Sequence, residues 1–292
     1  MGYIFLFTAL LAGSAKGFAG KKISGIITTP KQSVLSNFMR MIICIVISVA
    51  VLLLETKGQS LMPDRGAILV GILSGITLSA FTVTWMLAIR HGAYMLISVA
   101  QTFGMIVTLA CSFIVFREPV TARQYAGIVI LVIAVLIMVS YSNKIVGALT
   151  PYGITMLVLY GVSCGLYDFT GKLFTSFSDS PISTFNLITY FVSALFLGAV
   201  LLLPSKGEKI NAAEFVRKTI IAVFFMSVCI FVNTYFMTLT TKHLPPAQLY
   251  PFSRAGGMIL ASVMSSVFFK ERITARCVVG LCLSFVALLL LK

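Results

Sequence analysis

FREPVTARQYAG, residues 116–127, is repeated as FKERITARCVVG at residues 269–280. Six residues are identical between the two stretches, and each recurs 153 positions later. They are Phe116, Glu118, Thr121, Ala122, Arg123 and Gly127, matched by Phe269, Glu271, Thr274, Ala275, Arg276 and Gly280. A stretch that recurs half a chain later indicates an internal duplication.

The match extends over most of the chain at nearly the same spacing. The further pairs are Gly104-Met105-Ile106 with Gly257-Met258-Ile259, VLLL at 51–54 with VLLL at 200–203, and Phe18, Gly20 and Lys21 with Phe169, Gly171 and Lys172. Small loop insertions explain the drift in spacing. We therefore predict two tandem units, residues 1–146 and residues 147–292.

The composition indicates a membrane protein. Hydrophobic residues make up 59% of the 292 residues, charged residues only 10%, and the mean hydropathy is +1.04. A soluble domain needs roughly a quarter of its residues charged, whereas this length accommodates about ten spans of about 20 residues. The net charge of +14 comes from basic residues that flank apolar runs. This placement favours lipid headgroups over nucleic acid as their partner.

Neither a metal site nor a cleaved leader is predicted. The six cysteines lie in apolar segments at irregular spacing, without a metal-ligand or redox motif, so we expect no cofactor. The N-terminal MGYIFLFTALLAGSAKG lacks the basic region of a signal peptide. Because the repeat also matches it to an internal segment, we expect a retained first helix.

Continuous apolar runs without period-2 alternation predict membrane helices rather than barrel strands. The expected fold is all-α, with ten spans near 2–20, 35–55, 66–89, 93–116, 121–142, 150–175, 182–204, 213–241, 246–269 and 273–291. Five crossings per unit make the second unit start on the opposite side of the membrane. The two units are therefore inverted repeats, an architecture in which two near-equivalent halves surround a central cavity.

The duplicated stretch has a structural interpretation. Thr121 with Gln124 fits a capping box, and Thr274 fits an N-cap. We expect the pairs Glu118–Arg123 and Glu271–Arg276 to close the two hairpins, with Gly127 and Gly280 in the helices that follow.

AIRHGAYMLISVAQTFGMI at 88–106, TTKHLPPAQLYPFSRAGGMI at 240–259 and the two duplicated stretches resemble segments of the drug/metabolite transporter superfamily, in its EamA-like ten-helix branch. The resemblance covers essentially the whole chain. It implies transport of small molecules, with substrates in the family that range from amino acids and sugars to amines and drugs. One departure is that the first helix carries Lys16 and no acid, whereas small relatives use a glutamate there.

Three charged residues lie well inside predicted spans: Lys16, Asp168 and Arg254. Each costs about 2.5–3.5 kcal/mol in lipid on insertion scales, so they must face a wet cavity or one another. Arg254 either binds a solute carboxylate or phosphate or pairs with Asp168. Asp168 either holds an ammonium group or a proton, or pairs with Arg254 or Lys16. Lys16 either joins the site or extends to the interface.

Uncharged polar and aromatic residues complete the predicted binding site. Singly, such residues more often join helices or sit at the interface, but together they indicate a polar solute. They are Gln101, Trp85, Tyr160, Tyr167, Asn233, Tyr235, Asn186, Asn37 and Tyr250.

These observations favour a secondary transporter with alternating access, and the opposite charges of Arg254 and Asp168 favour a zwitterion such as an amino acid. Organic cations or drugs, sugar-like solutes, and a non-transporting receptor or scaffold remain alternatives. A membrane enzyme is disfavoured because no catalytic constellation occurs, and ATP drive because no phosphate-binding loop occurs. We expect a multi-pass protein of the bacterial inner membrane that is a monomer or a homodimer. We consider a proton as the coupling ion. Unmatched basic residues place both termini outside the cytoplasm.

Overall fold

The computed structural model describes residues 2–56, 62–91, 94–117, 121–145, 150–203, 211–241, 243, 246–270 and 274–291. Within them the chain is helical, without strands. The ten helices are α1 (Gly2–Ile23), α2 (Pro30–Thr56), α3 (Arg65–His91), α4 (Tyr94–Phe116), α5 (Ala122–Ile145), α6 (Pro151–Phe177), α7 (Ile182–Leu202), α8 (Ala212–Thr241), α9 (Pro246–Phe268) and α10 (Ala275–Leu291). The all-α prediction is confirmed. The predicted unit boundary at 146/147 lies outside the described residues.

The helices form an integral, multi-pass membrane protein. In the described residues, α1 to α8 are long and apolar enough to cross a bilayer, and α9 and α10 contribute shorter apolar stretches, Phe252–Phe268 and Ala275–Leu290. Large apolar side chains point away from the protein, among them Leu54, Leu202 and Ile221, which are 80%, 87% and 84% exposed. Water would disfavour such a surface, whereas lipid matches it.

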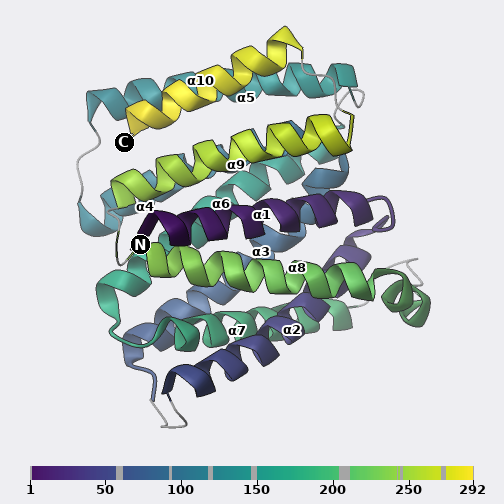
Figure 1. Ribbon diagram of the computed structural model, residues 1–292, viewed down its shortest axis with the longest axis vertical. Coiled ribbons are helices and arrows are strands. Elements are labelled where there is room, and N and C mark those ends of the chain that lie inside the picture. Colours follow the sequence, from purple (N-terminus) through teal and green to yellow (C-terminus); the bar gives the residue numbers. More distant parts are fainter. Residues whose placement is uncertain are drawn as a thin grey trace.

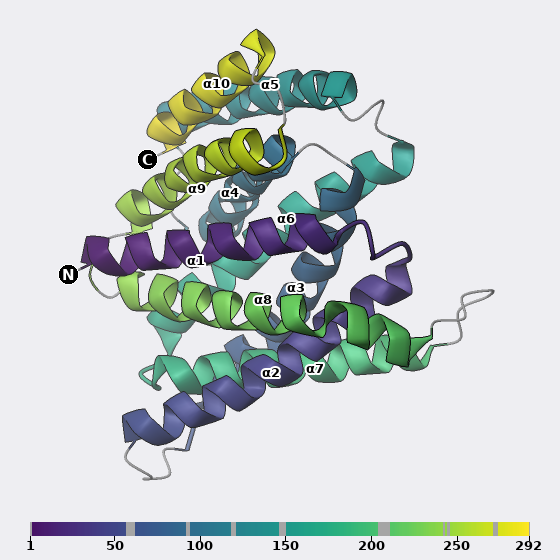
Figure 2. The same ribbon diagram turned by 45° about the vertical axis from the view of Figure 1, so that its right-hand side comes forward.

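The packing repeats when each helix is exchanged for its counterpart five helices later. α1 packs on α8, and correspondingly α6 packs on α3. α2 packs on α7, α4 on α9, and α5 on α10, and each of these pairs maps onto itself. Figure 1 shows α5 with α10 at the top and α2 with α7 at the bottom, and Figure 2 shows the same layers from another angle. The predicted architecture of two inverted five-helix repeats is confirmed, and the repeats interlock rather than form separate bodies.

The start of α2 differs from the prediction in a way that affects the site. The helix begins at Pro30 rather than near residue 35. Thr29 and Gln32 form a capping box, in which the backbone N–H of Gln32 donates to Thr29 Oγ1 at 3.2 Å and that of Thr29 donates to Gln32 Oε1 at 3.2 Å. Proline is favoured at the first helical position. All later residues of α2 therefore lie more than one helical turn further from the start of the helix than the sequence predicted.

The duplicated stretch builds the same helix junction twice. Arg117 and Lys270, at matching positions, both adopt left-handed backbone with φ of 54° and 53°, which ends α4 and α9. Thr121 N–H then donates to Gln124 Oε1 at 2.8 Å to begin α5. At α10 the Cys277 N–H donates to Thr274 Oγ1 at 3.4 Å.

The glutamates of the predicted hairpin pairs, Glu118 and Glu271, lie outside the described residues. Arg123 is the second residue of α5, and Arg276 Nη1 donates to Ser140 Oγ at 3.0 Å. Gly280 lies against α5, because a Cβ there would approach Met138 Cγ to 2.7 Å. Gly127 is buried in α5.

Candidate functional site

A cavity of about 180 Å³ lies between the two repeats. Its walls come from α1, α3 and α4 of the first repeat and from α6, α8 and α9 of the second, with Phe185 of α7. At the density of liquid water, this volume holds roughly six water molecules. Helices of both repeats therefore line the cavity.

Glycines allow α4 and α6 to pack closely where they form part of the cavity wall. A Cβ on Gly165 would lie 2.1 Å from the carbonyl oxygen of Gly104, and a Cβ on Gly161 would lie 3.1 Å from that of Ala100. Thr108 Oγ1 also donates to Gly165 O at 2.9 Å. Small residues permit such close helix contact in a membrane. This contact places Asp168, one turn beyond Gly165, against the cavity.

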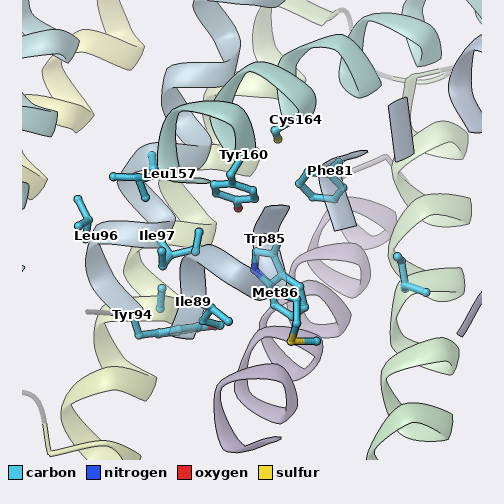
Figure 3. Packing of buried hydrophobic residues seen from close by; sticks show 14 of the residues in the cluster. Phe81, Trp85, Met86, Ile89, Tyr94, Leu96, Ile97, Leu157, Tyr160 and Cys164 are labelled. Carbon is cyan, nitrogen blue, oxygen red and sulfur yellow. The ribbon is translucent and has the colours of Figure 1, made fainter. Parts of the chain in front are cut away.

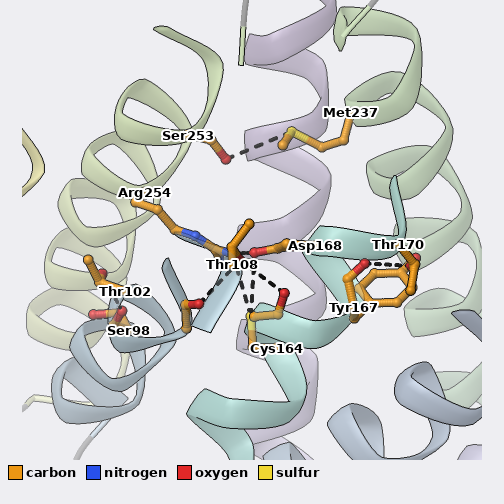
Figure 4. A network of polar contacts seen from close by, with 12 residues as sticks. Ser98, Thr102, Thr108, Cys164, Tyr167, Asp168, Thr170, Met237, Ser253 and Arg254 are labelled. Carbon is orange, nitrogen blue, oxygen red and sulfur yellow. Dashed lines mark hydrogen bonds and ion pairs between the residues drawn. The ribbon is translucent and has the colours of Figure 1, made fainter. Parts of the chain in front are cut away.

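The two opposite charges predicted from the sequence meet in the cavity. Arg254 Nη2 of α9 forms an ion pair with Asp168 Oδ2 of α6, and the same nitrogen lies 3.5 Å from Cys164 Sγ. The Arg254 and Asp168 side chains are only 9% and 19% exposed. Figure 4 shows the guanidinium directed at the carboxylate. Of the alternatives that the sequence left open, this structure adopts the Arg254–Asp168 pair.

Lys16 lies over aromatic rings at another part of the cavity wall. Its Nζ is 5.1 Å from the ring centre of Trp85 and 5.4 Å from that of Phe81, distances typical of cation–π contacts. α1 can approach these side chains because glycines face them. A Cβ on Gly20 would lie 2.2 Å from Trp85 Cη2, and one on Gly17 would lie 2.0 Å from the Tyr94 hydroxyl.

The aromatic wall is continuous. The Phe81 ring stacks on Tyr160 with centres 5.6 Å apart and on Tyr167 with centres 5.8 Å apart, and Figure 3 shows Phe81, Trp85 and Tyr160 together. Gln101 and Asn233 also line the cavity, and Asn233 Nδ2 donates to Ala9 O at 2.7 Å. Eight of the predicted site residues are thus brought together: Arg254, Asp168, Lys16, Gln101, Trp85, Tyr160, Tyr167 and Asn233.

Other predicted site residues lie elsewhere. Asn37 and Asn186 are fully or nearly fully buried within α2 and α7, outside the cavity wall. Tyr235 donates its hydroxyl to the Glu55 carboxylate. The preceding residue, Thr234, lines the cavity. Because each residue of a helix is rotated by about 100° from the one before it, the Tyr235 side chain points away from the cavity. The Tyr250 side chain lies outside the described residues.

Sequence reasoning missed a further charged residue inside a span, Arg40. Its side chain is 0% exposed, and Nη1 donates to Asn37 Oδ1 at 2.7 Å. Its Cζ lies 5.7 Å from the Trp85 ring centre. Nε and Nη2 have no hydrogen-bond partner in the described part of the chain. A predicted start at residue 35 placed Arg40 near a helix end, and the capping box at Thr29 was the signal that would have corrected this.

In the described residues, no three His, Cys, Asp or Glu side chains gather as a metal site requires. The polar groups of the cavity are instead suited to hold a solute by charge and hydrogen bonds.

Comparison with known proteins gives a family and a fold. A solved structure titled "Crystal structure of protein" is 15% identical, with a TM-score of 0.52, over 99% of this chain and 95% of that one. At this identity the likeness concerns the fold alone. No curated protein matches the sequence. A family model described as EamA-like transporter family matches residues 1–140 and again residues 151–292. The chain, a membrane protein of two interlocked repeats, therefore belongs to the EamA-like transporter family.

Proposed function

We propose that this protein is a secondary active transporter that moves a small polar solute by alternating access. The observation that carries the proposal is the cavity between the repeats, whose wall holds three charged side chains, Lys16, Asp168 and Arg254. Charges at this depth are costly in lipid and mark solute or ion pathways.

Alternating access is supported by a difference between matching positions of the two repeats. Around Gly20 the ends of α1 and α3 are in contact, through the Trp85 ring and through Lys21 Nζ, which donates to Ile89 O at 3.1 Å. At Gly171, the counterpart of Gly20, an added Cβ would have no described atom within 4 Å. Matching ends of the repeats are thus packed differently. In an inverted repeat, exchange of the two arrangements opens the other face.

The solute has polar groups that can replace contacts within the cavity. A zwitterion, the hypothesis from the sequence, requires Arg254 and Asp168 to exchange their mutual ion pair for the two ends of the solute. An organic cation would have to displace Arg254 from Asp168. Sugar-like solutes would rely on Gln101, Ser98 and the tyrosines of the wall.

Reconstitution tests the proposal. Purified protein in liposomes should take up at least one labelled metabolite faster than protein-free liposomes, and Arg254→Ala should slow that uptake about tenfold or more, as loss of a buried charged contact does. Lys218→Gln is the matched control, because it removes a cation that is 57% exposed on α8. A solute that binds but never crosses would favour a receptor. An imposed pH gradient, compared between wild type and Asp168→Asn, tests proton coupling.

The proposed location is the bacterial inner membrane, where a ten-helix protein of this kind would exchange solutes with the cytoplasm. Fractionation of cells that express the protein tests this location.

A further inference from the structure

Among the residues that the structure describes, the cavity wall contains more positive than negative charge. Lys16 and Arg254 share it with one carboxylate, Asp168, and that carboxylate is already paired with Arg254. The other acidic residues that the structure describes lie at helix ends or between helices: Glu55, Asp64, Asp179 and Glu214. Among the described residues, Lys16 therefore has no carboxylate within ion-pair distance.

Arg40 adds a second cation without a counter-charge. Arg40 Cζ and Lys16 Nζ lie 5.7 and 5.1 Å from the same Trp85 ring centre. Arg40 is fully buried, its hydrogen-bond partner Asn37 is neutral, and two of its nitrogens have no described partner. A guanidinium remains charged in proteins. The indole ring attracts both cations but carries no net charge, so the excess of positive charge persists on this side of the cavity.

This excess distinguishes between classes of solute. A zwitterion adds no net charge to the cavity, and an organic cation adds to the repulsion. An anion compensates the charge of Lys16 and of the buried Arg40, which is otherwise costly. We infer that the transported solute carries more acidic than basic groups at neutral pH. Its class is the small organic anions, such as carboxylates or phosphate monoesters, with an acidic group bound at Lys16. The inference rests on the proposed transport function and narrows its substrate class.

An exchange experiment tests this class without prior choice of a solute. Liposomes that contain the protein are loaded with the small-molecule fraction of a cell extract. They are then placed in the same fraction prepared with ¹³C label. Exchange of labelled for unlabelled solute requires no ion gradient. Mass spectrometry identifies each solute whose label enters faster than in protein-free liposomes, and the solutes are sorted by net charge at pH 7.

The expected result is that the exchanged solutes are net negative. For example, glutamate should be favoured over glutamine, and glycerol 3-phosphate over glycerophosphocholine, if these pairs exchange. Exchange confined to zwitterions, neutral solutes or cations would overturn the inference while it supports transport. Absence of all exchange would instead overturn the proposed transport, and the inference with it.

Substitutions of Lys16 test whether the acidic group of the solute binds at this side chain. Lys16→Gln should lower exchange of the anions about tenfold or more, Lys16→Arg should retain most of it, and Lys218→Gln should leave it unchanged. Anion exchange at the wild-type rate in Lys16→Gln would contradict the assignment. Size-exclusion chromatography checks that each variant is folded. If Lys16→Gln is not folded, the net charge of the solutes that the wild-type protein exchanges still tests the inference.

Discussion

Removing the Asp168 carboxylate should destabilise the protein more than removing its partner. Asp168→Asn leaves Arg254 buried beside a cavity that also holds Lys16, so two lining cations face no lining anion. Loss of one partner of a buried ion pair typically costs about 3–5 kcal/mol. Little reduction for solvent applies here, because the two side chains are only 9% and 19% exposed. Arg254→Met should cost less, because Asp168 retains Lys16 as a cation in the same cavity.

The double variant Asp168→Asn/Arg254→Met should recover most of the lost stability. A neutral pair of similar volume avoids the uncompensated charge, and such replacements are often close to neutral. The expected coupling free energy is roughly 2–4 kcal/mol.

Thermal unfolding in detergent, followed by fluorescence of Trp85, the only tryptophan, measures these differences. A cost of about 3–5 kcal/mol corresponds to a fall in melting temperature on the order of 10 °C for a chain of this size. Glu214→Gln is the matched control, because it breaks the Glu214–Lys218 pair, whose side chains are 54% and 57% exposed. It should change the melting temperature little. A melting temperature of Asp168→Asn within about 2 °C of wild type, or costs that simply add in the double variant, would refute the reasoning.

Three further predictions concern the packing and one connecting segment. Gly165→Ala should destabilise the protein by about 1–3 kcal/mol, because the added Cβ would lie 2.1 Å from a backbone oxygen. Gly257→Ala is the control and should melt as wild type does, because its Cβ would have no described atom within 4 Å. Equal melting temperatures of the two variants would contradict the α4–α6 contact. Gly20→Ala should shift the emission spectrum of the tryptophan that its Cβ would meet at 2.2 Å, and Gly171→Ala should not; identical spectra would argue against closure at that end. Hydrogen bonds from the backbone N–H of Ala67 and from two serine hydroxyls lower the pKa of Asp64 below 3.8, so its contribution to stability is complete above about pH 4 and is lost as the pH falls through the lowered pKa. The difference in melting temperature between wild type and Asp64→Ala should therefore be constant from pH 7 to 5 and shrink below pH 4, and a difference that grows on acidification would disprove it.

Much of the architecture could be predicted because its signals are local in the sequence. Apolar runs longer than a bilayer is thick determine the helices, and a repeat of five spans determines that the second unit is inverted. The capping box of Thr121 with Gln124 was also predictable, since its partners are three residues apart. The start of α2, by contrast, was predicted five residues too late. The cap at Thr29 starts α2 before residue 35, so Arg40 lies within the helix, fully buried, rather than near its end.

The site depended on contacts that no local pattern specifies. The cost of burying a charge in lipid showed that Lys16, Asp168 and Arg254 must face a cavity or one another. It did not show which of them would pair and which would face the cavity. Arg254 and Asp168 are 86 residues apart, and their ion pair requires α9 and α6 to face the same cavity. Tyr235 was misplaced because a rotation of about 100° per residue separates a lining position from its neighbour, and Asn37 because its helix turns it toward Arg40. The sequence by itself thus determined the helices, their duplication and their inversion. Only the tertiary structure decided which buried charges neutralise each other, because that balance depends on distances between helices that are remote in the chain.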